Sequence, residues 1–421
     1  MLDATTLQPI ENIDAEGFLR LNPTGNGRYL SVSTTQGFEL LDLGTWEEPH
    51  GDHSHYFTAT PQLDGVLVAA QKPGHAIPHN GSVTFFDDAT GSATTYDSAQ
   101  FSTIGNPTAA EPTFKYKAPE AHHGLAVRLS DSSLIVSEGN SESRSSVKHL
   151  APDGSLIAQT TQCTGVHGEA ISQAEVVVVG CEDGPVVFSN RGVTKVLIPD
   201  TYGRIGNLAG AENSPVVLGD YKTDKDAELE RPTRISLINT TSKTLQIVNL
   251  PASYSFRSLA RSEEGDALVL GTDGKIHVIA PLTGAITASI PVIEPWEEPT
   301  QWQEPRPTIL ALDGSIYVTD PATSRLLAVD LETQKIWNEA TLEFKPNEIA
   351  GGTGRVPAPV SGSDEGTHAP GDSKTGRDES GHDESGHSET GHDESGHGYS
   401  GDEHSENEHH ESSPGHERHS H

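Results

Sequence analysis

Apolar residues between positions 18 and 350 occur in short runs and show almost no helical spacing. Runs such as 29–33, 175–180 and 267–271 are bounded by Gly, Pro, Asn, Asp and Ser. Short apolar runs between turn-forming residues are typical of β-strands. The pattern therefore predicts an all-β fold.

The strand pattern also repeats along the chain. A unit of strand, Gly turn, strand, turn and strand recurs with a period of roughly 40 to 50 residues, which is the period of propeller blades. Seven such units are found, at 18–43, 57–88, 124–154, 168–190, 206–242, 258–284 and 307–333. A radial array of blades leaves only short sheet edges exposed. We therefore predict a single seven-bladed β-propeller.

Two alternatives to this fold remain open. Eight blades would fit if the long connections at 90–120 and 285–305 contain further strands. A pair of β-sandwiches is less favoured, because the repeat does not change character along the chain. We expect a strand after Thr333, such as 341–344, to join the first blade and close the ring.

The composition changes abruptly at Gly351, after which Gly, Ser, Asp, Glu and His dominate. Such a segment cannot bury enough apolar surface to fold alone. We divide the chain into a lead-in segment at 1–17, a propeller at 18–350 and a disordered tail at 351–421.

The tail carries a pentapeptide repeat of the type Gly-His-Asp-Glu-Ser between positions 381 and 400. Imidazole binds zinc, copper(II) and nickel, and carboxylates can complete the shell. A purification tag is normally an uninterrupted His run, so the tail does not have the pattern of a tag. We predict several weak, exchangeable metal sites with the tail ligands His382, His387, His392, His397, His404, His409, His410, His416, His419 and His421.

Histidines also precede three of the predicted strand runs in the propeller. These are His55, His123 and His167, each at a comparable position in its repeat. Residues just before the innermost strand of each blade meet at the mouth of the central channel, so we expect the three to converge there. Three histidines and a fourth ligand suit tetrahedral Zn²⁺. The alternative is that each histidine is a hydrogen-bonded turn residue.

Further ligand candidates lie close to these histidines in the sequence. The candidates for a fourth ligand are His122, His53, Asp52 and Glu169. His122 is one residue out of phase with His123 and should point differently along an extended chain, so we expect a supporting or alternate ligand.

We make separate predictions for the histidines outside these motifs. His75 and His79 are expected in a strand connection, either as a second metal site or as simple loop residues. His149 and His277 are expected to be structural. The single Met in the chain argues against a copper(I) site built on thioethers.

The formal net charge of -34 argues against binding to nucleic acid or to anionic membrane surfaces. It favours cationic ligands, or serves solubility alone. No stretch reaches the roughly 18 apolar residues of a transmembrane helix, so we expect no membrane insertion. No export signal is recognisable at the start, and we expect that one has been removed.

Cys163 and Cys181 flank a predicted strand at 174–180. Two cysteines at this separation fit a local disulfide in an oxidising compartment. Buried thiols or metal ligands are the alternatives.

Enzyme motifs are absent from the sequence, since neither Gly-x-Ser-x-Gly nor His-Glu-x-x-His occurs. We therefore expect a protein that is not an enzyme. The alternative is a metal-dependent propeller hydrolase or lactonase, in which Glu169 acts as general base for a zinc-bound water.

These motifs resemble those of the AztD-type periplasmic zinc metallochaperones. The resemblance rests on Ala-His-His-Gly at 121–124, Val-His-Gly-Glu at 166–169, the two cysteines and the His-rich tract at 50–55, and it covers roughly residues 10–350. It implies a monomeric propeller of the periplasm or cell envelope. Such a protein passes Zn²⁺ by ligand exchange to the substrate-binding protein of a zinc ABC importer. The position of the long His-rich segment at the C-terminus departs from the family pattern, and we expect it to capture metal.

Overall fold

The computed structural model describes residues 1–17, 19–103 and 110–355. All of them belong to one compact unit. The predicted tail ligands lie outside the described residues, as does the proposed tail domain apart from residues 351–355.

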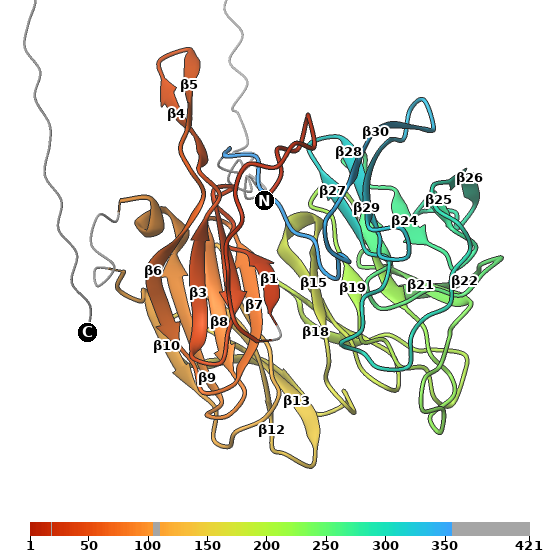
Figure 1. The fold of residues 1–421 in the computed structure, drawn as a ribbon. Helices are drawn as coiled ribbons and strands as arrows, with labels where there is room; N and C mark the ends of the chain where they lie inside the picture. Colours follow the sequence, from red (N-terminus) through yellow and green to blue (C-terminus); the bar gives the residue numbers. More distant parts are fainter. Residues whose placement is uncertain (18, 104–109, 356–421) are drawn as a thin grey trace, which may run out of the picture. The chain divides into compact units, whose positions relative to one another are not determined.

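Seven four-stranded antiparallel sheets follow one another along the chain (Figure 1). Blade 1 contains β1 (Arg20–Pro23), β2 (Tyr29–Ser33), β3 (Gly37–Asp42) and β6 (Gln62–Ala69); blade 2 contains β7 (Pro73–His79), β8 (Ser82–Asp87), β9 (Ser92–Asp97) and β10 (Phe114–Lys117); blade 3 contains β11 (Ala126–Arg128), β12 (Leu134–Gly139), β13 (Arg144–Leu150) and β14 (Leu156–Thr160); blade 4 contains β15 (Glu169–Ser172), β16 (Val176–Val179), β17 (Val186–Ser189) and β18 (Gly192–Lys195). Blade 5 contains β19 (Leu208–Ala209), β20 (Val216–Asp220), β21 (Arg234–Asn239) and β22 (Thr244–Asn249); blade 6 contains β23 (Leu259–Arg261), β24 (Ala267–Leu270), β25 (Lys275–Ile279) and β26 (Ile286–Pro291); blade 7 contains β27 (Ile309–Leu312), β28 (Ser315–Asp320), β29 (Arg325–Asp330) and β30 (Lys335–Thr341). The predicted seven-bladed propeller is confirmed.

Three minor elements lie outside the blades. Strands β4 (Thr45–His50) and β5 (His53–Thr58) form a separate hairpin between the third and fourth strands of blade 1, and Figure 1 shows it projecting from that blade. The 3-10 helices η1 (Ser98–Thr103) and η2 (Gln173–Glu175) are short. Among the described residues, no helix is long and apolar enough to cross a membrane.

The blades are held together by apolar faces that pack on each other. One cluster joins Val127 and Ile135 of blade 3 to Val177 and Phe188 of blade 4, all at most 1% exposed. Complete burial of a side chain of this kind contributes roughly 1.5 to 3 kcal/mol to folding. The first strands of neighbouring blades contact one another, as β7 does with β1 and β11. The seven first strands therefore line the centre of the ring.

The two long connections do not supply an eighth blade in the described residues. The region 90–120 contributes the outer strands β9 and β10 of blade 2, and the region 285–305 contributes the outer strand β26 of blade 6. The predicted unit at 57–88 is also divided between two blades, because residues 67–69 of its apolar run belong to β6 of blade 1.

The ring is closed by irregular segments near the first and the last of the described residues. Leu7 is buried against Tyr317 and Leu326 of blade 7. Gly354 N donates to Gly27 O at 2.9 Å, and Glu47 N donates to Gly354 O at 3.0 Å. The expectation that residues 341–344 add a strand to blade 1 is wrong, because the last strand, β30, pairs with β29 inside blade 7.

Candidate metal centre

Three histidines from three consecutive blades lie close together near the beginning of the innermost strand of each blade. His75 lies in β7, His123 precedes β11 and His167 precedes β15. The ring centroids of His123 lie 5.2 Å from those of His75 and His167, and the His75 and His167 centroids are 6.0 Å apart. We call His75, His123 and His167 the central cluster.

A local irregularity of β7 brings His75 into this cluster. The pairing of β7 with β8 shifts register between Pro73 and Ala76, which is a β-bulge. Bulges re-aim side chains next to functional sites. Gly74, inside the bulge, has no room for a side chain, because a Cβ atom would lie 2.3 Å from Asp88 Oδ1. The missing side chain thus allows the Asp88 carboxylate to approach the bulge.

Each ring of the central cluster has an oxygen near its Nδ1 atom. His167 Nδ1 lies 2.8 Å from Gly206 O, and a carbonyl only accepts, so this nitrogen carries the proton. His123 Nδ1 lies 2.7 Å from Oδ2 of the buried Asp88. His75 Nδ1 lies 3.1 Å from Oε2 of Glu169. The hydrogen bonds at Nδ1 of His123 and His167 leave Nε2 of each ring with its lone pair for a metal, while His75 is held beside Glu169 by charge alone.

The charges around the cluster act on its histidines in opposite directions. Burial, together with the charges of His75 and Arg204, lowers the pKa of His167 to about 3, so this ring stays neutral. Burial opposes the charged form of His75 as well, but the nearby carboxylates of Glu169 and Asp88 together raise the pKa of His75. Glu169 Oε2 is buried and receives no well-aligned hydrogen bond. Three imidazoles and an underused carboxylate oxygen form a donor set that fits Zn²⁺.

A hollow of about 420 Å³ opens beside His123. Its lining includes Asp88 and His123 together with the cationic side chains Lys72 and Arg144. The hollow gives small solutes a route to the edge of the cluster.

A second histidine cluster lies on the β4–β5 hairpin. His50, His53 and His55 are exposed, and their ligating atoms all lie within 4.8 Å of one another. Among the described residues, this is the one group of three or more potential ligands that meets that distance. Asp52 Oδ1 lies 3.1 Å from His53 Nδ1. We call His50, His53 and His55 the hairpin cluster.

Comparison with known proteins finds relatives of this chain. No family model matches the chain. A curated protein of Citrobacter koseri named zinc chaperone AztD is 27% identical over 321 residues, which cover 73% of this chain and 72% of the relative. The predicted resemblance to AztD is confirmed.

Solved structures support the same fold. A crystal structure of Citrobacter koseri AztD matches with a TM-score of 0.70 and 24% identity, covering 85% of this chain and 95% of that one. A structure of apo AztD from the same organism matches with a TM-score of 0.70 and 22% identity, covering 84% and 95%.

The AztD-like motifs at 121–124 and 166–169 supply two of the three central histidines. His123 and His167 lie together, as predicted. The predicted position of His55 is wrong, because β5 belongs to the hairpin and the inner strand of blade 2 is β7. His53 and Asp52 lie on the same hairpin, apart from the central cluster.

His122, inside the first AztD-like motif, faces away from the cluster. It is 2% exposed, its Nδ1 lies 3.1 Å from Glu120 O and its Nε2 lies 3.0 Å from Ser137 Oγ. With both nitrogens occupied, His122 supports the loop before β11 and offers no free ligand atom. The expectation of an alternate ligand does not fit this placement.

His75 and His79 do not form a site of their own. Both lie in strand β7 rather than in a connection, and only His75 joins the central cluster. His79 is buried and pairs with Glu175, which also accepts a hydrogen bond from Ser130 N at 2.9 Å. His79 therefore ties blade 2 to its neighbours.

His149 and His277 are structural, as expected. His149 Nε2 lies 2.8 Å from Ser133 Oγ, and His277 bonds both Ser289 and Asp273.

Asp88 and Gly206 were not found from the sequence. Asp88 comes directly after β8, and this strand itself ends in Asp. Several predicted units have an Asp at the end of a strand, and Asp is common in turns. Gly206 acts through its carbonyl, which leaves no signal in residue type.

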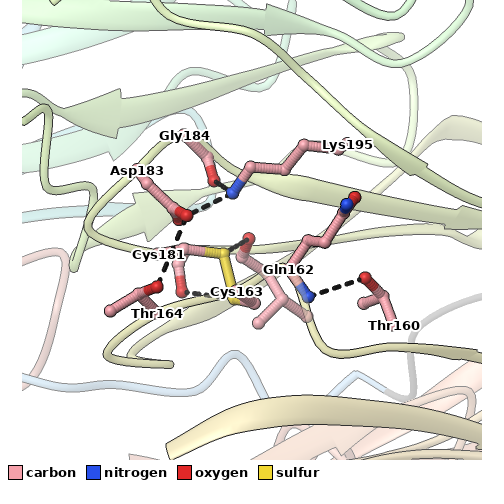
Figure 2. Close-up of a disulfide and its surroundings, with 10 residues drawn as sticks. Thr160, Gln162, Cys163, Thr164, Cys181, Asp183, Gly184 and Lys195 are labelled. Carbon is pink, nitrogen blue, oxygen red and sulfur yellow. Dashed lines mark hydrogen bonds and ion pairs between the residues drawn. A yellow bond between two sulfur atoms is a disulfide. The ribbon is translucent and has the colours of Figure 1, made fainter. Parts of the chain in front are cut away.

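The predicted disulfide joins Cys163 and Cys181, and Figure 2 shows it between Thr160 of blade 3 and Lys195 of blade 4. Both cysteines are completely buried.

Proposed function

We propose that this protein is an extracytoplasmic zinc metallochaperone that holds Zn²⁺ at His75, His123 and His167. The observation that supports this proposal is the approach of the three rings to within 6.0 Å of one another, with an oxygen beside each Nδ1. In this proposal Glu169, whose Oε2 lies 3.1 Å from His75 Nδ1, serves as a fourth ligand or orients His75. The zinc chaperone named among the relatives supports zinc as the metal.

The proposal includes transfer of zinc to the substrate-binding protein of a zinc ABC importer. Ligand exchange requires that the donors be replaced one at a time. Here each of the three donors comes from a separate blade. The hairpin cluster and the tail histidines would capture metal before it reaches the central cluster. The disulfide supports a periplasmic or cell-envelope location, because such bonds persist in oxidising compartments.

The role is non-enzymatic, in agreement with the chaperone name of the curated relative. Zinc-dependent turnover of lactones or esters would instead favour the alternative in which Glu169 activates a zinc-bound water.

Competition against a chromophoric zinc chelator tests the central site in the full chain. We expect the triple substitution His75→Ala, His123→Ala and His167→Ala to weaken the tightest zinc equivalent at least about 100-fold, because all three imidazole ligands are lost. The matched control replaces the same number of histidines, His50, His53 and His55, and should leave that equivalent in place. Survival of the tightest equivalent in the central triple variant would refute the proposal.

Transfer has its own test. Zinc-loaded protein is mixed with a zinc-importer binding protein, and the rate of transfer is followed against acceptor concentration. Direct exchange gives a rate that rises with acceptor concentration and exceeds the rate of release to a chelator. A rate equal to spontaneous dissociation would rule out direct transfer.

A further inference from the structure

We infer that the Cys163–Cys181 disulfide is a positioning element of the metal centre, acting on His167. The inference rests on the proposed function, since it concerns the affinity of the same site. It assigns to the bond a role in holding one ligand, in addition to its contribution to stability.

The disulfide joins the segment that leads into His167 to the segment that follows β16. Hydrogen bonds continue this connection: Glu182 N donates to Thr164 O at 2.8 Å, and His167 N donates to Gly180 O at 3.1 Å. Gly180 N then donates to Gly168 O at 3.0 Å. The backbone of His167 is thus held against the residue next to Cys181 (Figure 2 shows the disulfide itself).

The acceptor that orients the imidazole is linked to the same cysteine, and Asp220 also holds it, because Gly206 N donates to Asp220 Oδ1 at 2.6 Å. Ile205 N donates to Cys181 O at 2.9 Å, and the next residue, Gly206, accepts from His167 Nδ1 at 2.8 Å. Both the main chain of His167 and the partner of its ring are therefore linked to the segment after β16 that contains Cys181.

The backbones of these segments are in direct contact, so a displacement of one segment displaces the others. A Cβ atom at Gly180 would lie 2.2 Å from Ile205 O and 2.6 Å from His167 O. A Cβ atom at Gly168 would lie 2.3 Å from Gly206 O. Because no side chain separates the segments, none can absorb a displacement of the Cys163 or Cys181 segment.

The other two ligands have different supports. His123 is oriented by the Asp88 side chain, and His75 is placed by the bulge in β7. The chain contains no further cysteine. Loss of the disulfide should therefore act on the metal centre through His167.

The test compares zinc binding by the full-length wild type and the variant Cys163→Ala/Cys181→Ala, which adds no thiol or hydroxyl ligand. We expect zinc affinity at the central cluster to fall about 10- to 100-fold, the range for loss of an outer-shell support, with faster release to a chelator. Circular dichroism should retain the β-sheet signal. The variant Cys163→Val/Cys181→Ala, which keeps more apolar volume, serves if the alanine pair does not fold.

A double-mutant cycle with His167→Ala separates positioning from general loss of stability. Once His167 is absent, removing the disulfide should cause no further loss of zinc affinity. Leu268→Ala, a core substitution in blade 6, provides a control that lowers the unfolding midpoint and should leave zinc affinity unchanged.

The two proposals fail in different ways. If the cysteine variant binds and releases zinc like the wild type while His167→Ala is impaired, the positioning role is refuted and the metal centre stands. If His167→Ala itself binds zinc like the wild type, the proposed metal centre fails.

Discussion

The central cluster and the hairpin cluster each contain three histidines, but they hold them in opposite ways. In the central cluster every ring has an oxygen beside its Nδ1, and Asp88 is only 5% exposed in its side chain. In the hairpin cluster all three residues are exposed, and the acidic partner Asp52 is fully exposed. The ligating atoms are nevertheless closer together in the hairpin.

The difference separates two properties of a metal site. Proximity of donors alone favours fast capture, because exposed rings can rotate to meet an ion. Oriented donors in a partly buried site favour retention, because protein dipoles are fixed and water competes less. We therefore expect the hairpin to exchange zinc quickly and the central cluster to release it slowly.

Two glycines with positive φ give the largest expected contrast between the regions. Gly168 has φ of +76° and a Cβ would lie 2.3 Å from Gly206 O, whereas Gly51 has φ of +65° and open space around it. Gly168→Ala should cost about 2 to 4 kcal/mol of unfolding free energy and weaken central zinc binding, because backbone strain and a clash combine. Gly51→Ala should cost about 1 kcal/mol, from backbone strain alone. Denaturant unfolding measures both, and equal losses would contradict the comparison.

Asp88 and Asp52 test whether burial makes an orienting carboxylate effective. Asp88→Asn should weaken zinc binding at the central cluster about 10- to 100-fold, since the carboxylate fixes the His123 tautomer. Asp52→Asn should change the affinity of the hairpin cluster less than about twofold, because an exposed pair contributes little. Chelator competition gives both values. A large effect of Asp52→Asn would show that exposure of an orienting carboxylate does not limit its contribution to zinc affinity.

Glu169 gives the central cluster a distinct pH dependence. Zinc must displace a proton from His75 below the raised pKa of that ring, so affinity falls as pH falls through this value. Glu169→Gln removes the charge that raises the pKa, so the fall should begin at a lower pH. Affinity at neutral pH should itself decrease about tenfold, from the loss of an outer-shell partner.

The matching control for Glu169 is Glu48→Gln on β4, which should leave the pH profile of the central site unchanged. Titrations at a series of pH values between about 5 and 8, where histidines change charge, compare the variants. An unshifted profile in Glu169→Gln would show that this carboxylate does not set the charge of His75.

The smallest expected effect concerns the base of the hairpin. Trp46 stacks on Phe57 with ring centroids 5.4 Å apart, and the Arg28 guanidinium lies 4.0 Å from the Trp46 ring centre. Phe57→Ala should cost about 0.5 to 1.5 kcal/mol, within the range for an aromatic pair. Tryptophan fluorescence should report the change, while central zinc affinity stays the same. A reduced central affinity would show that the two clusters are coupled.

The repeat in the sequence was sufficient to predict the blades, because each blade buries its own short apolar runs. It also placed His123 and His167 correctly, since both precede the first strand of a blade. It failed at the first two blades, where the hairpin inserts two extra strands into blade 1. Counting strands through this insertion made His55, rather than His75, the expected third histidine.

The remaining features of the site depend on tertiary structure. The bulge that turns His75 inward is a change of register between β7 and β8, and residue types do not encode it. Asp88 has the same local pattern as ordinary turn aspartates, and its role arises from contact with His123. The hydrogen bond from His167 to Gly206 joins residues of different blades through a main-chain carbonyl, which any residue could supply.

The origin of the three central histidines in blades 2, 3 and 4 has a thermodynamic consequence for the whole ring. A metal that binds only when these blades are correctly spaced stabilises their association. By mass action, this stabilisation is about 4 kcal/mol when the free metal concentration is a thousand times the Kd. Linkage requires the converse, so a partner that binds more tightly to a slightly opened ring weakens metal binding by the same factor. Such a partner could unload zinc by pressing on the rim, without offering a ligand of its own.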